Sequence, residues 1–249
     1  WLARKHMTRD YAIYVHVFGR QGERIGGVDT HPGGGNLPTR LWLPGDMIRD
    51  EYVVHIAPEA TVPTAGAIRV GVYEAQGRKE LPITDAYGRT LGPSPQIASI
   101  RIAPVRPFHY QPQQAAQVNL GDKVTFAGYD LVSDAVSAGK PLEIALYWQT
   151  LSRMGKDYTV FMHLVNNAGE LAAQVDGQPL DGDYSTHYWQ VGEQIRDVRR
   201  LSLPVDLPAG QYYLHIGLYL LDTGARLPVV GADPPVDYIK LGPIPIQGK

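Results

Sequence analysis

The sequence predicts an all-β protein made of two tandem β-sandwich domains, and three observations lead to this fold class. First, the chain repeats itself at a spacing of 147 residues, with 17 identities in the 50 ungapped pairs that start at Trp1 and end at Asp50. Second, Gly (27) and Pro (20) are abundant, which is typical of short strands joined by tight turns. Third, alternating apolar and polar runs recur along the chain, and no segment shows a capped helical period.

The repeat sets the number of domains. Its identical pairs include Trp1 with Trp148, His16 with His163, and Asp50 with Asp197. Because each copy of such a repeat is one folding unit, we expect two domains, at residues 1–105 and 106–249. The second copy has strand-like segments at 124–131 and 142–150, most of which the first copy lacks. The first sandwich is therefore expected to lack its N-terminal strands, and the chain to be a piece of a longer polypeptide.

Period-two alternation between turn signals places the strands. In the second copy, the strands are expected at 124–131, 142–150, 158–165, 171–176, 195–203, 207–219 and 238–246. In the first copy, they are expected at 11–18, 25–29, 63–73 and close to residue 100. Tyr212 or Tyr213, just after a Pro-x-Gly turn, indicates a tyrosine corner. Two packed sheets fit this strand number better than a closed barrel, and immunoglobulin-like and jelly-roll topologies both stay open.

Residues 103–117 are predicted to be the linker between the domains. This segment contains Pro104, Pro107 and Pro112 together with four Gln. Proline restricts the backbone, so we expect a semi-rigid connection that holds the domains in a preferred relation.

Composition excludes several classes of function. The net charge is −2 and the basic residues are scattered, so nucleic acid and anionic membranes are not expected partners. The chain has no Cys, which excludes disulfides, zinc–thiolate sites and thiol nucleophiles. No apolar run approaches the 18 or so residues of a transmembrane helix, so any membrane contact is expected through segments outside this chain.

An ordered series of motifs marks the second copy. It consists of Asp157-Tyr-Thr-Val-Phe-Met-His-Leu-Val165, Gly169, Asp176-Gly177, Trp189, Gly192-Glu193, Leu207-Pro-Ala-Gly-Gln-Tyr212, Gly217-Leu-Tyr219 and Arg226-Leu-Pro228. With these motifs the chain resembles the β-sandwich modules that follow the multi-pass region of bacterial membrane glycosyltransferases of the protein-mannosyltransferase-like class, and related surface proteins. The resemblance implies an extracytoplasmic, cell-surface or secreted location in a bacterium and an accessory role near glycan chemistry. It carries over no catalytic residue.

Aromatic residues in the loop 177–191 are the first ligand candidates. Tyr184, His187, Tyr188 and Trp189 lie together there, and the repeat adds Trp42 from the first copy. Sugar rings stack their C–H faces on aromatic planes, so this group suits a carbohydrate. We expect Tyr184 and Tyr188 to face water. The alternative for Trp42 and Trp189 is that each fills the end of its sandwich beneath the loop.

The same loop holds a candidate metal site. Asp176, Asp181 and Asp183 lie within eight residues, an oxygen-rich spacing that suits Ca²⁺. The first copy retains only Asp29 of the three, so calcium would bind one copy. Asp-Gly pairs are also ordinary turn formers, which is the structural alternative.

A hydroxyl–imidazole–carboxylate relay is the only catalytic pattern to weigh. It would join Thr39, His16 and Asp29 in the first copy, and their repeats Thr186, His163 and Asp176 in the second. Thr is a poor nucleophile without special activation, and the chain has no Gly-x-Ser-x-Gly elbow. We therefore expect the His to bond across a hairpin, the Asp to cap a turn, and the protein to be no enzyme.

The expected function is that of a non-catalytic extracytoplasmic interaction module associated with carbohydrate and belonging to a longer membrane or surface protein. Binding would use the loop 177–189, with weak affinity per site gained by repetition. The alternative is a structural subunit of a surface layer, sheath or filament, in which a second copy or a neighbouring chain supplies strands to the first domain. A hydrolase ranks last.

Overall fold

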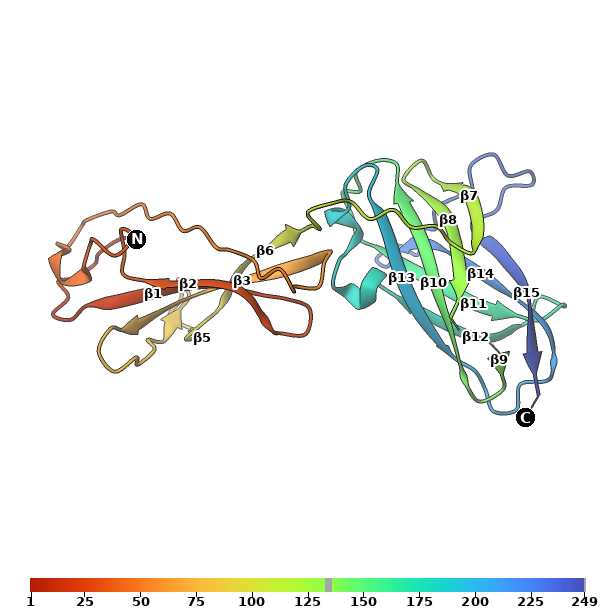
Figure 1. Cartoon of the computed structure of the whole chain (residues 1–249), viewed down its shortest axis with the longest axis horizontal. Coiled ribbons are helices and arrows are strands. Elements are labelled where there is room, and N and C mark those ends of the chain that lie inside the picture. The colour runs from red at the N-terminus through yellow and green to blue at the C-terminus, as the bar shows by residue number, and fades with distance from the viewer. Residues whose placement is uncertain (133–135, 249) are drawn as a thin grey trace. The chain divides into compact units, whose positions relative to one another are not determined.

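The computed structural model describes residues 1–132 and 136–248, and the chain divides into two compact units, Trp1–Ala103 and Pro104–Lys249 (Figure 1). We call them unit 1 and unit 2. The sequence-based boundary lies after residue 105. The fold is all-β, which confirms the predicted class: helical geometry in the described residues is limited to three short 3-10 turns. No helix there is long and apolar enough to cross a membrane.

Unit 2 is a two-layer sandwich. One layer has the strand order β13-β10-β8-β7, and the other has the order β12-β11-β14-β15-β9. All neighbouring strands are antiparallel except β15 and β9, which are parallel. The strands are β7 (Gln114–Leu120), β8 (Val124–Leu131), β9 (Val136–Ser137), β10 (Pro141–Thr150), β11 (Tyr158–Val165), β12 (Leu171–Gly177), β13 (Gln194–Ser202), β14 (Gly210–Leu220) and β15 (Ile239–Gln247).

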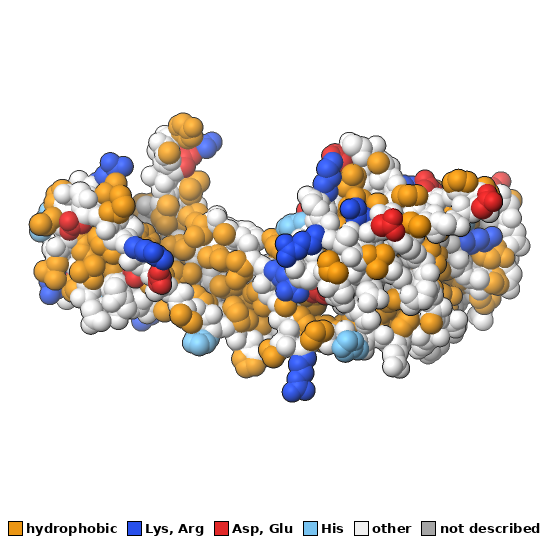
Figure 2. Space-filling view, turned by 90° about the horizontal axis from the view of Figure 1, so that it is seen from above, with side chains coloured by type: hydrophobic (Ala, Val, Ile, Leu, Met, Phe, Trp, Pro, Cys, Tyr) orange, Lys and Arg blue, Asp and Glu red, His pale blue; other side chains and the backbone are white. Residues whose placement is uncertain are grey.

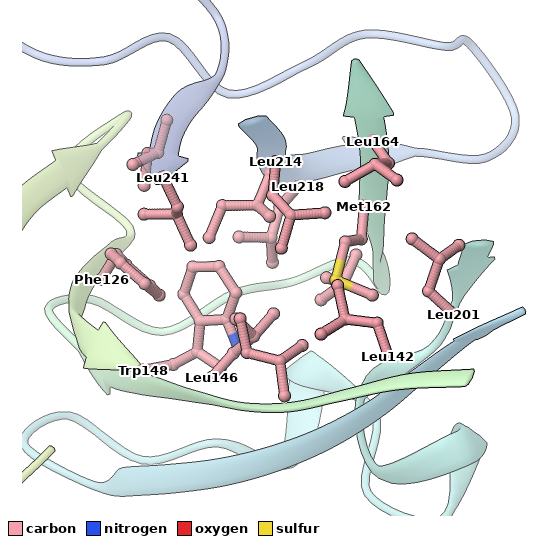
Figure 3. Packing of buried hydrophobic residues seen from close by; sticks show 14 of the residues in the cluster. Phe126, Leu142, Leu146, Trp148, Met162, Leu164, Leu201, Leu214, Leu218 and Leu241 are labelled. Carbon is pink, nitrogen blue, oxygen red and sulfur yellow. The ribbon is translucent and has the colours of Figure 1, made fainter. Parts of the chain in front are cut away.

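The core of unit 2 lies between these layers (Figure 3). Phe126, Leu146 and Trp148 project from the first layer. Met162 and Leu214 meet them from the second, and all five side chains are fully buried. Alternate residues of each strand point inward, so every second residue contributes to burial. Each such side chain contributes about 1.5–3 kcal/mol, which makes the contact between the sheets the main source of stability.

Unit 1 contains a single main sheet. Its strand order is β2-β1-β3-β6, and a two-stranded hairpin, β4-β5, lies beside it. The strands are β1 (Tyr11–Phe18), β2 (Arg24–Thr30), β3 (Thr64–Glu74), β4 (Ile83–Thr84), β5 (Thr90–Gly92) and β6 (Gln96–Ile102). A buried cluster of Val17, Ile25 and Ile102, with Val54 and Ile56 packed against it, forms a small core at one end of the sheet.

The sheet of unit 1 is the equivalent of the second layer of unit 2. Strands β1, β2, β3 and β6 take the places of β11, β12, β14 and β15. The layer β13-β10-β8-β7 has no counterpart as a regular sheet among the described residues of unit 1. The expectation that the first sandwich lacks its N-terminal strands is thereby confirmed.

Two local predictions have different outcomes. The tyrosine corner forms, because the Tyr212 hydroxyl donates to the Pro208 carbonyl oxygen at 3.0 Å. The predicted linker 103–117 is wrong at its C-terminal end, because β7 begins at Gln114. This strand lies at the edge of its layer, where much of it is exposed and Gln is tolerated, so apolar alternation is weak.

The sandwich predicts the effect of a cavity at its centre. We expect Leu214→Ala to lower the free energy of unfolding by about 2–5 kcal/mol, because the fully buried side chain leaves a void between the sheets. Urea unfolding followed by circular dichroism measures this. The control is Val198→Ala, at a side chain that is 39% exposed, where we expect a change within about 0.5 kcal/mol. Equal losses in the two variants would contradict the core assignment.

Candidate functional site

The loop after β12 does not display its aromatic rings. Tyr184 and Trp189 are both 0% exposed, and Trp42 is 5% exposed. The Trp189 indole N–H donates to the Tyr184 carbonyl oxygen at 2.9 Å, and the Trp42 indole N–H donates to the Leu37 carbonyl oxygen at 3.3 Å. Each indole thus holds its own loop against the end of the unit to which it belongs. The prediction that Tyr184 faces water is wrong, and Tyr184, Trp189 and Trp42 are structural.

Tyr188 and His187 are the more accessible members of that group. Tyr188 is half-buried and stacks on Tyr184, with ring centroids 5.9 Å apart. His187 is exposed, and its Nδ1 lies 2.6 Å from Asp157 Oδ1. Only Tyr188 and His187 thus remain for ligand contact, and His187 is already paired with a carboxylate. The loop therefore offers much less aromatic surface than the sequence suggests.

The three candidate calcium ligands do not come together. Among the described residues, no three His, Asp or Glu side chains gather in a way that would hold a metal ion. Asp176 lies on β12 and faces His163, with 3.4 Å between its Oδ1 and the imidazole Nε2. Asp181 and Asp183 belong to the turn at Pro179–Gly182 and its C-cap, where Asp181 adopts a left-handed φ of 55°. The Asp181-Gly182 pair therefore acts as a turn former, whereas Asp176-Gly177 ends strand β12.

The hydroxyls of the postulated relay bond elsewhere. Thr186 is fully buried, accepts a hydrogen bond from the Tyr158 N–H (2.9 Å) and donates to the Lys156 carbonyl oxygen (2.9 Å). Thr39 repeats this pattern: it accepts from the Tyr11 N–H and donates to the Arg9 carbonyl oxygen. Each Thr ties its loop to the start of a strand. The imidazole–carboxylate pairs do form across the hairpins, as the structural alternative expects.

A buried ion pair, which the sequence analysis did not identify, positions the loop after β12. Asp197 on β13 is fully buried, accepts from the Arg199 guanidinium at 2.7 Å and accepts from the Leu180 N–H at 2.9 Å. Arg199 also donates to the carbonyl oxygens of Gly177 and Gln178. A carboxylate this deep is stable only when it is paired and hydrogen-bonded, and both conditions hold here.

Polar and aromatic side chains gather on the outer face of the second layer of unit 2, away from the core. Phe161 and His163 come from β11, Asp176 from β12, His215 and Tyr219 from β14, and Tyr238 precedes β15. We call these six residues the outer-face cluster. Its rings are in contact: the Phe161 and His163 centroids are 5.1 Å apart, and His215 stacks on Tyr238 at 4.0 Å.

Cations border the outer-face cluster. The Arg226 guanidinium lies 4.2 Å above the Phe161 ring and 3.4 Å from Asp237, and the Lys240 ammonium lies 3.8 Å above the ring of Tyr213. Phe161 itself is covered, whereas His163, Asp176 and Arg226 retain access to water. Half-buried rings beside accessible charged groups can take a ligand that offers both C–H faces and hydroxyls.

Unit 1 carries the same arrangement at the same register. Asp29, Tyr14 and Gly71 are paired across β2, β1 and β3, as Asp176, Phe161 and Gly217 are across β12, β11 and β14. His16 Nε2 lies 3.0 Å from Asp29 Oδ2, and its ring stacks on Tyr14 at 4.5 Å. The Gly at the third position is needed, because a Cβ there would lie within 3 Å of the aromatic ring in both units.

The surroundings shift the pKa values of two residues of the outer-face cluster, His215 and Tyr219. Burial lowers the pKa of His215, and the positive charges of Lys240, His163 and Arg226 lower it further. Burial raises the pKa of Tyr219, and the Asp176 carboxylate adds to this shift. The lowered pKa favours the neutral form of His215, and the raised pKa favours the neutral form of Tyr219.

Comparison with known proteins leaves function open. No protein-family model matches the chain, and no curated protein sequence matches it. Among solved structures, the chain is similar to the crystal structure of the C-terminal domain of wzt, at 12% identity over 56% of this chain and 83% of that chain, with a TM-score of 0.37. A likeness this distant carries no argument about function. The glycosyltransferase class stays a prediction.

Part of the lowering of the His215 pKa is predicted to disappear when the charge of Lys240 is removed. We expect the pKa of His215, followed by NMR of the imidazole, to lie below the usual value of about 6.5, and Lys240→Met to raise it. Because the folded-state pKa is the lower one, the free energy of unfolding should fall as the pH drops through the ordinary His range. Lys156→Met is the control. A His215 pKa that Lys240→Met leaves unchanged would contradict this account.

Proposed function

We propose that the protein is a non-catalytic binding module for carbohydrate and that the outer-face cluster is its site. The site differs from the one expected from sequence, because Tyr184 and Trp189 of the loop are fully buried. The observation that carries the proposal is the recurrence of one side-chain constellation, at one register, on the outer sheet face of both units. Neither sheet needs a His–Asp pair beside an aromatic ring for its own core, which lies on the other face.

The chemistry of the cluster suits a sugar. The stacked rings of His215 and Tyr238 offer an apolar surface for C–H groups, at low cost in conformational entropy. Asp176 can accept hydrogen bonds from hydroxyl groups, and Arg226 can donate to them. A neutral sugar needs no strong charge for capture, which agrees with the net charge of −2.

Duplication supports recognition of a repeating polymer. Unit 1 presents His16, Asp29 and Arg24 together, with Arg24 Nη1 3.2 Å from the imidazole Nε2. The central ring of each constellation is buried, Tyr14 at 4% and Phe161 at 1% exposure, so a ligand would contact mainly the groups around it and weak affinity per site is expected. Two sites on one chain raise the effective affinity for a ligand that spans both, if their spacing matches.

The absence of catalysis is part of this proposal. Support comes from Thr39 and Thr186, whose hydroxyls are committed to backbone partners and so do not serve as nucleophiles. A location outside the cytoplasm and membership of a longer surface or membrane protein are proposed with it, and they rest on the sequence motifs alone.

A glycan array probed with the full chain tests the proposal. We expect binding to a neutral polysaccharide that Tyr238→Ala or Asp176→Asn weakens by about tenfold, or about 1.4 kcal/mol, because each variant removes a ligand contact on the sheet face.

The matched control is His187→Ala, which alters an exposed ring of the loop. It should leave binding unchanged. Loss of binding in His187→Ala with full binding in Tyr238→Ala would show that the loop is the binding site. No binding to any glycan on a broad array would contradict the proposal.

A further inference from the structure

The inner face of the unit 1 sheet is apolar and incompletely covered. Val15 pairs with Val70 across β1 and β3, as Met162 pairs with Ile216 in unit 2. Met162 and Ile216 are fully buried, whereas Val15, Val70 and the neighbouring Ile68 are only half-buried. The same side of the same sheet is therefore sealed in one unit, whereas in the other it is buried at Ile13 and Val17 and only half-covered between them.

A hollow of about 590 Å³ lies over this face, lined by Val15, Ile68 and Val70 of the sheet and by Ile48, Tyr52 and Ile97, with Arg49 and Asp50 also in its lining. Trp1 and Ile97 remain 41% and 63% exposed there. Figure 2 shows hydrophobic side chains gathered over unit 1, on the left, while those on the visible face of unit 2 are more scattered. Contiguous exposed apolar surface of this kind marks an interaction site.

The first residues of the missing layer are present in unit 1. The Trp1 nitrogen donates to the Ile48 carbonyl oxygen (2.6 Å), and the Ile48 N–H donates to the Trp1 carbonyl oxygen (2.8 Å). Their equivalents, Trp148 and Ile195, are opposite each other in the β10–β13 pair. Ala3 bonds to Asp46 and Gly45 with the geometry that Thr150 has with Glu193 and Gly192. Residues 1–3 and 45–48 thus reproduce one end of that pair.

Beyond Ile48, the counterpart of β13 continues with no strand paired along the edge that faces Trp1, although Ile56 at its far end forms an isolated antiparallel bridge with Gly26 of β2. Residues 48–56 are extended and alternate between half-buried and exposed side chains, as β13 does between buried and exposed ones. Because Ile48 and Trp1 exchange both of their hydrogen bonds, the N–H groups of Asp50, Tyr52 and Val54 point to the same side. Among the described residues, none of these three groups donates to a backbone carbonyl.

We propose that this inner face is a docking site for one β-strand whose alternate residues are Leu or Ile, added antiparallel to residues 48–56. Unit 2 shows the occupant that fits: β10 places Leu142, Ile144 and Leu146 opposite Leu201, Arg199 and Asp197, the equivalents of Val54, Tyr52 and Asp50. The incoming strand gains backbone hydrogen bonds along the edge and seats its apolar side chains in the hollow over Val15 and Val70. This inference does not depend on the carbohydrate proposal.

The test adds a strand in trans to the full chain. The probe is a fluorescein-labelled peptide of residues 140–147, and its matched control carries Leu142→Ser, Ile144→Ser and Leu146→Ser. We expect saturable binding by fluorescence anisotropy that the control peptide loses by at least about tenfold. Ile97→Glu in the chain, a change at an exposed rim residue, should weaken binding to the same degree. Val53→Glu, 77% exposed, should not.

Three outcomes would overturn the proposal. The peptide does not bind, or it binds equally well to the Ile97→Glu chain, which would place it elsewhere. Alternatively, sedimentation of the chain alone shows a dimer that Ile97→Glu dissociates, in which case a second copy covers the face.

Discussion

The requirement that an apolar sheet face be covered governs both halves of this protein. In unit 2 the two layers meet this requirement for each other, with Trp148 and Phe126 opposite Met162 and Leu214. Unit 1 has the same inner-face pattern on β1 and β3, but only residues 1–3 and 45–56 stand where the partner layer belongs. Its small core around Val17 seals one end of the sheet and Ile13 is buried at the other, but Val15, Ile68 and Val70 between them are only half-buried.

Burial of the inner face of each sheet determines which side chains lie on its outer face. Strict alternation along β11 directs Met162 inward and therefore directs Phe161 and His163 outward, and β1 does the same with Tyr14 and His16. Since neighbouring strands keep their register, the Asp, the aromatic ring and the Gly stay side by side in both units. The candidate site is thus a by-product of the same periodicity that builds the core, which explains how duplication could preserve it.

The repeat and the alternation were sufficient to predict the long strands, because the alternation is local in sequence, but they missed the edge strand β7 and the short strands β4, β5 and β9. Burial of Trp189 was the structural alternative that the sequence offered, but burial of Tyr184 was not predictable in the same way: the 3-10 turn between the two residues brings both rings into the core, and the Trp189 indole donates to the Tyr184 carbonyl oxygen. The outer-face cluster was not predicted because its members lie on three different strands and in the segment before a fourth. One signal could have found it: Gly71 and Gly217 align at a spacing of 146, one less than the main repeat.

Solvent access to the inner face is the central claim, and paramagnetic relaxation enhancement of methyl NMR signals by a soluble probe measures it directly. The account predicts strong enhancement for the methyl groups of Ile68 and Val70 in unit 1, and almost none for those of their equivalents, Leu214 and Ile216. Equal protection of both pairs in the isolated chain would contradict it, because the face of unit 1 would then be as fully covered as that of unit 2.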